Sequence, residues 1–228
     1  MHIFPVFNIS VVLLLNVLSF VPIGNASAAD GNFGASLMLS GDNEITAMDV
    51  IMIVPPKPIN NPSALWTWVG IQQHKGSKIL RSTLSYNTNC GSTGDKAAIS
   101  PEYAEATLNC GGSHVLLANT TQEIYIQFRK VNTVWNLYVT NKETLETSTL
   151  SVDVLNTPQK RALLGVHAPV DMKTTGDLIF KNWVIQASLP DPNLCGNLQL
   201  SRNTICSSPQ VYEGNLQCAL TNCVMKLT

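Results

Sequence analysis

Hydrophobic and polar residues alternate along most of the middle of the chain. In Glu123–Arg129 the apolar side chains Ile124, Ile126 and Phe128 fall on one side, and Val134–Thr140 alternates in the same way. A period of two residues is that of a β-strand with one buried face. We therefore predict two neighbouring strands in this part of the chain.

Short runs of the same kind recur between residues 35 and 187, at a spacing of roughly 10 residues. Turn residues separate them, and the further runs are Ile45–Val54, Leu65–Ile71, Ile79–Tyr86, Thr147–Leu155, Ala162–Val166 and Asp177–Gln186. No amphipathic helical pattern longer than about two turns is found. The pattern predicts an all-β protein, an antiparallel sandwich of two sheets.

The first 29 residues have the pattern of a secretory signal peptide. An apolar stretch, Ile9–Ile23, is followed by the small residues Ala26, Ser27 and Ala28, which suit a cleavage site. The alternative is an N-terminal membrane anchor, but the stretch is shorter than the ~20 residues of a spanning helix. We expect a secreted, extracellular protein with no membrane span once residues 1–29 are removed.

The chain has six cysteines, all after this segment: Cys90, Cys110, Cys195, Cys206, Cys218 and Cys223. An even number in an exported chain predicts three disulfides. Cys90 and Cys110 stand apart from the rest and are expected to pair, while the last four can form two bridges in three ways. A linker at Ser188–Pro192 separates the β-sandwich domain, 30–187, from a cysteine-rich C-terminal module, 188–228.

Composition and motifs exclude several classes of function. A net charge of −1 gives no electrostatic basis for binding nucleic acid. The sequence contains no phosphate-binding loop, no dinucleotide-binding glycine motif, no serine-hydrolase elbow and no CxxC pair, and its histidines lack a local metal-ligand spacing. We predict neither a cofactor nor a metal.

Four residues are candidates for binding a ligand. Trp66 and Trp68 lie on one side of a predicted strand, where they form either a core layer or a platform that stacks on a sugar. Lys78 and Arg81 belong to a small basic run nearby, which is either a solvated turn or a contact for an anionic ligand. Separately, Asn119 begins the sequon Asn-Thr-Thr and is the candidate glycosylation site.

Acidic residues give no clear catalytic pair. Glu102 and Glu105 follow Pro101 in a polar stretch that we expect at the surface. Asp153 lies within a predicted strand, but its polar neighbours indicate a solvent-facing side.

Several segments resemble the glutamic peptidases, the eqolisin family of secreted acid proteases. That family has a strand ending in VP, a strand containing WVGI and a strand containing ILQTG. Here the corresponding order is Ile45–Pro55, then Trp68–Ile71, then Ile79–Thr83, and the likeness extends to Gln186. The resemblance implies a concanavalin-like double-sheet fold, of the jelly-roll kind also found in lectins and glucanases.

The resemblance also implies that the catalytic residues of the family are missing. The third residue of ILQTG is the catalytic glutamine, and this position is Arg81 here; Leu163 stands in the place of the catalytic glutamate. An arginine is permanently charged and cannot serve as the neutral amide that orients water. We therefore expect no catalytic residues and no enzymatic activity.

Three functions follow from this sequence. The first is a secreted, non-catalytic, lectin-like binding protein whose partner is a glycan or an extracellular protein, although glycan binding rests on analogy of fold. The second is a divergent secreted acid hydrolase, either a peptidase or a glycosidase. The third is an extracellular structural or interaction protein.

Overall fold

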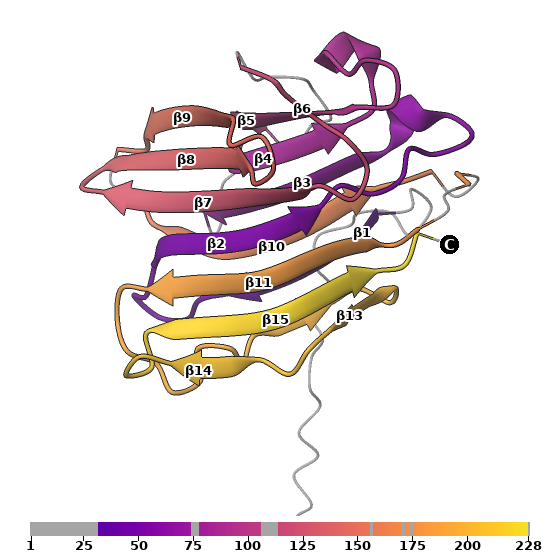
Figure 1. The fold of residues 1–228 in the computed structure, drawn as a ribbon. Coiled ribbons are helices and arrows are strands. Elements are labelled where there is room, and N and C mark those ends of the chain that lie inside the picture. Colours follow the sequence, from indigo (N-terminus) through magenta and orange to yellow (C-terminus); the bar gives the residue numbers. More distant parts are fainter. Residues whose placement is uncertain are drawn as a thin grey trace, which may run out of the picture.

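Two antiparallel β-sheets lie face to face and account for most of the residues that the structure describes (Figure 1). The computed structural model describes residues 32–73, 78–105, 114–155, 157–169, 172–173 and 176–227. Within these ranges the only helices are the short 3-10 turns Pro62–Ala64 and Thr88–Cys90. The predicted all-β, two-sheet sandwich is confirmed.

The first sheet has seven strands. In spatial order they are β12 (Leu198–Leu200), β1 (Asn32–Met38), β10 (Gln159–His167), β3 (Trp66–Gln73), β4 (Lys78–Ser85), β5 (Ala97–Glu105) and β6 (Leu116–Ala118).

The second sheet has eight strands: seven follow one another in space, and the eighth, β14, pairs with one of them. In spatial order the seven are β13 (Thr204–Cys206), β15 (Gln217–Met225), β11 (Leu178–Ala187), β2 (Ile45–Ile53), β7 (Glu123–Val131), β8 (Val134–Asn141) and β9 (Thr147–Asp153). The eighth strand, β14 (Gln210–Tyr212), pairs with β15. Every strand that the alternation predicts is present in one of the two sheets.

The core lies between the sheets and follows from the alternation. Each strand turns every second side chain inward, so that β7 buries Phe128 completely while Gln127 and Arg129 stay outside. The largest fully buried side chains, Trp135 and Trp183, come from β8 and β11. Burying a large apolar side chain contributes roughly 1.5–3 kcal/mol, so this layer stabilises the pairing of the sheets.

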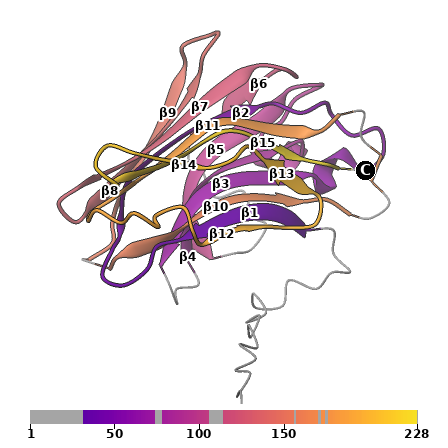
Figure 2. The same ribbon diagram turned by 90° about the horizontal axis from the view of Figure 1, so that it is seen from below.

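The C-terminal residues extend both sheets. Strand β12 pairs with β1 at the edge of the first sheet, whereas β15 pairs with β11 over most of its length in the second. Seen from below, β12, β1 and β10 lie in one layer and β14, β15 and β11 in the other (Figure 2). Hydrogen bonding thus continues across the boundary at residue 188 that the composition indicates.

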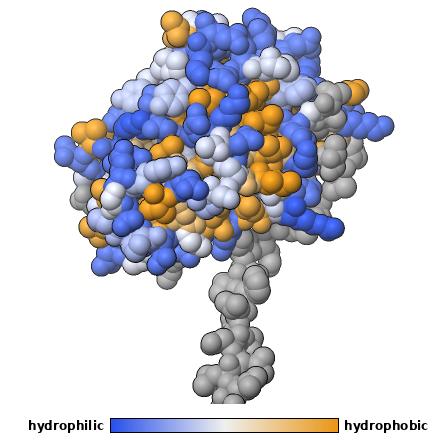
Figure 3. Space-filling model, turned by 60° about the horizontal axis from the view of Figure 1, so that its bottom comes forward, coloured by the Kyte–Doolittle hydropathy of each residue, from blue (hydrophilic) through white to orange (hydrophobic). Residues whose placement is uncertain are grey.

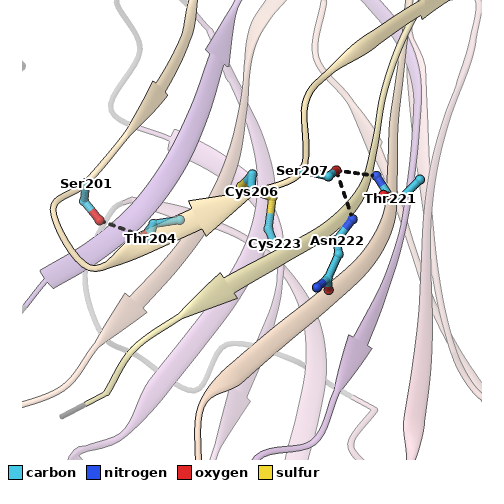
Figure 4. The surroundings of a disulfide bond; sticks show 7 residues. All are labelled: Ser201, Thr204, Cys206, Ser207, Thr221, Asn222 and Cys223. Atoms are coloured by element: carbon cyan, nitrogen blue, oxygen red, sulfur yellow. Dashed lines mark hydrogen bonds between the residues drawn. A yellow bond between two sulfur atoms is a disulfide. The ribbon is translucent and has the colours of Figure 1, made fainter.

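Two disulfides hold these C-terminal strands, and they select one of the three pairings that the sequence allows. Cys195 bonds to Cys218, and Cys206 bonds to Cys223. The latter two face each other across β13 and β15, with Cα atoms 4.0 Å apart (Figure 4). Closing a loop of this length removes entropy from the unfolded chain and stabilises the fold by about 3 kcal/mol in the chain-entropy model.

Side-chain hydrogen bonds fix the chain on either side of the Cys206–Cys223 bridge (Figure 4). The Ser207 hydroxyl oxygen accepts from the backbone N–H groups of Thr221 at 3.0 Å and Asn222 at 3.3 Å. The hydroxyls of Ser201 and Thr204 lie 2.8 Å apart in the turn that leads into β13. This edge of the sandwich is therefore held by covalent and polar contacts together.

The remaining cysteines and the N-terminal segment are only partly described. Cys90 is disulfide-bonded, and Cys110, its predicted partner, lies outside the described residues. The predicted signal peptide, 1–29, also lies outside them. Among the helices of the described ranges, none has the length and hydropathy needed to cross a membrane.

Candidate functional site

One row of residues crosses the outer face of the first sheet, the face turned away from the core. Cross-strand pairing places Leu163 of β10 opposite Gly70 of β3, Gly70 opposite Arg81 of β4, and Arg81 opposite Glu102 of β5. Residues that oppose one another in neighbouring strands share a face of the sheet. Arg81 and Leu163, the two residues that we expected in place of the family's catalytic pair, therefore lie in the same row, separated by a glycine.

Arg81 and Glu102 form a buried ion pair in this row. Arg81 Nε donates to Glu102 Oε1 over 2.6 Å, and the two side chains are only 3% and 1% exposed. The Thr83 hydroxyl donates to the same carboxylate oxygen. Glu102 Oε2 is buried and has no hydrogen-bond partner among the described residues. The carboxylate is therefore neutralised by a permanent cation and screened from water.

The burial of Glu102 corrects the expectation of a surface position. Pro101 does not end the polar run in a loop: residues 97–105 form β5, and Glu102 is 2% exposed. Its charge is tolerated because the register brings Arg81 directly opposite. The sequence does contain a cation, Arg81, and an anion, Glu102, in two neighbouring runs. It does not contain the register between the two strands, which is needed to predict that these residues pair.

Gly70 lets the side chains of the neighbouring strand β4 pack closely against β3. A Cβ at this position would lie 2.7 Å from Ile79 Cγ2 and 3.0 Å from the Cβ of Arg81. The first contact is closer than real Cβ atoms accept and the second is unusually tight, so a larger residue would push the neighbouring side chains of β4 away. The glycine therefore leaves the room that Arg81 and Ile79 occupy.

The two candidate tryptophans share this outer face but differ in exposure. Trp66 is 6% exposed and packs with Cys90 and Ala98 in a small hydrophobic cluster. Trp68 is half-buried at the border of that cluster, and its indole covers Gly165, where an added Cβ would lie 2.2 Å from the ring. The structure thus brings both tryptophans to the face that carries Arg81, with Trp68 the more accessible.

Lys78 lies apart from this group. It begins β4, three residues before Arg81, so the two side chains lie on opposite faces of the sheet. Lys78 Nζ lies 5.5 Å from the centre of the Tyr103 ring. Tyr103 packs against the main core. Lys78 therefore contacts the opposite side of the sheet from the two tryptophans.

The outer face of the second sheet carries an exposed polar network instead. Asp49 of β2 accepts two hydrogen bonds from Arg129 Nη2, at 2.7 and 2.8 Å, and weaker ones from Tyr125 and Gln127 of β7. Burial and the nearby Asp49 charge raise the pKa of the Tyr125 hydroxyl. The side chains of Arg129 and Asp49 are 35% and 27% exposed, so water reaches this pair.

A hydrophobic row lies beside the polar network on the same face. The register aligns Ile53 of β2, Ile179 of β11, Val224 of β15 and Ile205 of β13, and Ile205 is 64% exposed. From the side of the C-terminal strands, hydrophobic residues gather in areas between hydrophilic ones (Figure 3). The face of the second sheet is thus divided between a polar and an apolar part.

Other candidates lie at the periphery. Asp153 is exposed at the end of β9, where its Oδ1 accepts from the N–H of Leu155 at 2.9 Å, so it caps a turn. Asn119 is exposed in the turn between β6 and β7. No group of three or more potential metal ligands occurs within the described ranges.

Comparison with known proteins identifies the fold. No protein-family model matches the sequence, and no curated protein sequence does. Scytalido-glutamic peptidase, solved with a peptide-based transition-state analogue, superposes with a TM-score of 0.56 at 14% identity, covering 84% of this chain and 98% of the peptidase. SCP-B, a member of the eqolisin family solved with the tripeptide Ala-Ile-His, gives 0.54 at 14% identity with the same coverages.

A toad ovary galectin in complex with thio-digalactose also matches, with a TM-score of 0.32 at 11% identity over 62% of this chain and 98% of the galectin. The two peptidase matches, at 14% identity, show a shared fold.

Proposed function

We propose that this chain is a secreted, non-catalytic binding protein that uses the outer face of its first sheet to bind a glycan. The observation that carries the non-catalytic part of the proposal is the row of Leu163, Gly70, Arg81 and Glu102. If the resemblance to the glutamic peptidases holds residue by residue, an aliphatic and a permanent cation stand where those enzymes have a carboxyl and an amide.

The ion pair supports the absence of acid–base chemistry. A general base or acid must exchange a proton with a substrate within hydrogen-bond reach. Glu102 is the one buried carboxylate of this face within the described residues, and it is held by Arg81 and Thr83 under almost complete burial. Its contacts are those of a structural counter-ion.

Trp68 supports the binding role. On the same face, His167 lies in the next row of the sheet, and Gln72 and Arg161 lie two rows away on the other side; all three are half-buried. An aromatic ring with polar groups around it suits the apolar face and the hydroxyls of a sugar. Burial lowers the pKa of Arg161 from its ordinary value. Its guanidinium offers several N–H donors to a ligand.

The test is a glycan array on the mature protein, followed by calorimetric titration of the best ligand. We expect Trp68→Ala to weaken binding about tenfold or more, a loss of roughly 1.4 kcal/mol, while thermal unfolding shows that the variant is still folded at the assay temperature. Tyr138→Ala is the matched control, because Tyr138 is a 37% exposed aromatic on the other sheet. Failure of every glycan to bind, or loss with Tyr138→Ala alone, would refute the proposal.

A further inference from the structure

The edges of the two sheets differ in length. Strands β12, β6, β13 and β14 each span three residues, whereas β9 at the edge of the second sheet spans seven. Its pairing with β8 runs without a bulge from Thr147 to Asp153. The strand contains no proline and no lysine, the residues that commonly protect an exposed edge from pairing with another chain.

The free edge of β9 presents unpaired backbone groups. Asn141 donates its N–H to the carbonyl of Glu146, and Val154 donates to Thr133, so the even-numbered residues of β9 are those bonded to β8. In an antiparallel ladder the alternate residues then turn their N–H and C=O groups to the other side. These residues, Thr147, Thr149, Ser151 and Asp153, are all exposed, and no described residue accepts from their amides.

Two exposed leucines flank this strand symmetrically. Leu145 and Leu155 lie at equal sequence distances from Leu150, at the centre of β9, and are 76% and 80% exposed. Both adopt a left-handed backbone conformation, with φ of 61° and 48°. Leucine rarely adopts this conformation, which costs on the order of 1–3 kcal/mol. The turns thus hold a hydrophobic side chain in solvent at each end of the open edge.

We propose that β9 pairs with β9 of a second copy of this chain, about a twofold axis at Leu150. In this register Thr147 lies opposite the partner's Asp153, and Thr149 lies opposite the partner's Ser151. The odd-numbered residues exchange the backbone hydrogen bonds that the isolated chain leaves open. The second sheets of the two copies then form one continuous sheet.

The register explains why a second copy fits this edge. Leu145 lies opposite the partner's Leu155, so each exposed leucine meets an apolar residue. No carboxylate faces another across the axis, because Asp153 and Glu146 lie opposite the partner's Thr147 and the partner's Val154. Hydroxyl pairs and apolar pairs across strands are stabilising, and a twofold interface requires such self-complementarity.

The test is the molar mass of the mature protein, measured by analytical ultracentrifugation over a concentration series. We expect a dimer that dissociates on dilution. In the double variant Leu145→Lys/Leu155→Lys, like charges face each other, and the dissociation constant should rise about tenfold or more. In Leu145→Lys/Leu155→Glu each cation faces an anion of the partner, so dimerisation should recover.

Two further variants separate edge pairing from misfolding. Ser151→Pro removes an N–H from the free edge and leaves the hydrogen bonds to β8 intact, so it should give a folded monomer. Ile59→Lys is the matched control, since Ile59 is 73% exposed but lies away from β9, and it should remain dimeric. A monomer at every concentration up to about 1 mM, a dimer unaffected by the lysine pair, or no recovery with the charge-paired variant would overturn the proposal.

This inference is independent of the ligand proposed for the first sheet. A monomeric protein that binds glycan through Trp68 would refute only the dimer, and a dimer that binds no glycan would refute only the proposed function.

Discussion

Two arginine–carboxylate pairs of nearly the same length lie on opposite faces of the sandwich. Arg81 and Glu102 on the first sheet are 2.6 Å apart and almost fully buried, whereas Arg129 and Asp49 on the second are 2.7 Å apart and partly exposed. Both pairs join a guanidinium to a carboxylate, and they differ most in how far water reaches them. The comparison therefore bears on what burial does to an ion pair.

Burial makes each member of the first pair depend on the other. Charges moved out of water lose hydration, and only the opposite charge and a few hydrogen bonds replace it. At the second pair, water takes the place of a missing partner, so the interaction contributes little on balance. On the outer face of the first sheet, neither charge of the pair can therefore be replaced alone without a large loss of stability. On the outer face of the second sheet, either charge can be replaced at little cost.

The largest effect is expected when one member of the buried pair is neutralised. Glu102→Gln leaves the Arg81 guanidinium without the charge of its carboxylate, and the free energy of unfolding should fall by about 3–5 kcal/mol. The matched change on the other face, Asp49→Asn, should cost only about 0–1 kcal/mol. Urea unfolding of both variants measures the difference, and equal losses would contradict the comparison.

Replacing both charges sharpens the same point. Arg81→Met combined with Glu102→Leu removes the need for a counter-ion. The free energy of unfolding of this double variant should exceed that of Glu102→Gln by roughly 1–4 kcal/mol, which restores most of the lost stability. A double variant as unstable as the single one would show that packing around these side chains, and not their charge, determines stability.

A smaller effect is expected at Gly165, which lies under the Trp68 indole. Gly165→Ala places a methyl group where ring atoms now lie, and the unfolding free energy should fall by about 1–3 kcal/mol as the indole shifts outward. Tryptophan fluorescence should change toward that of a more hydrated ring. An unaltered spectrum with unchanged stability would show that the indole does not occupy this position.

The smallest effect concerns acid pH and the exposed face. Hydrogen bonds from Lys142 and then Lys181 lower the pKa of Glu123 below its ordinary value of 4.5. A lowered pKa in the folded state means that the contribution is present above that ordinary value and is lost as the pH falls through the lower, folded one. Glu123→Gln should therefore slightly flatten the loss of stability below pH 4.5, as measured by unfolding at stepwise lower pH.

Alternation in the sequence was sufficient to predict the sandwich. The runs in β7 and β8 have one apolar side each, and the structure buries that side in the core. Strands β12 to β14 could not be found in this way because three residues are too short to show a period. The pairing of Arg81 with Glu102 was out of reach for another reason: it depends on the register between β4 and β5, which is set by contacts across the sheet.

The most direct test of the central proposal is an assay of the mature protein for cleavage of unfolded protein and of polysaccharide between acidic and neutral pH. The account predicts no turnover at any pH, because the row through Arg81 and Leu163 holds no carboxyl that is free to exchange a proton with a substrate. Turnover that disappears in Glu102→Gln, while the variant is shown to be folded under the assay conditions, would contradict it.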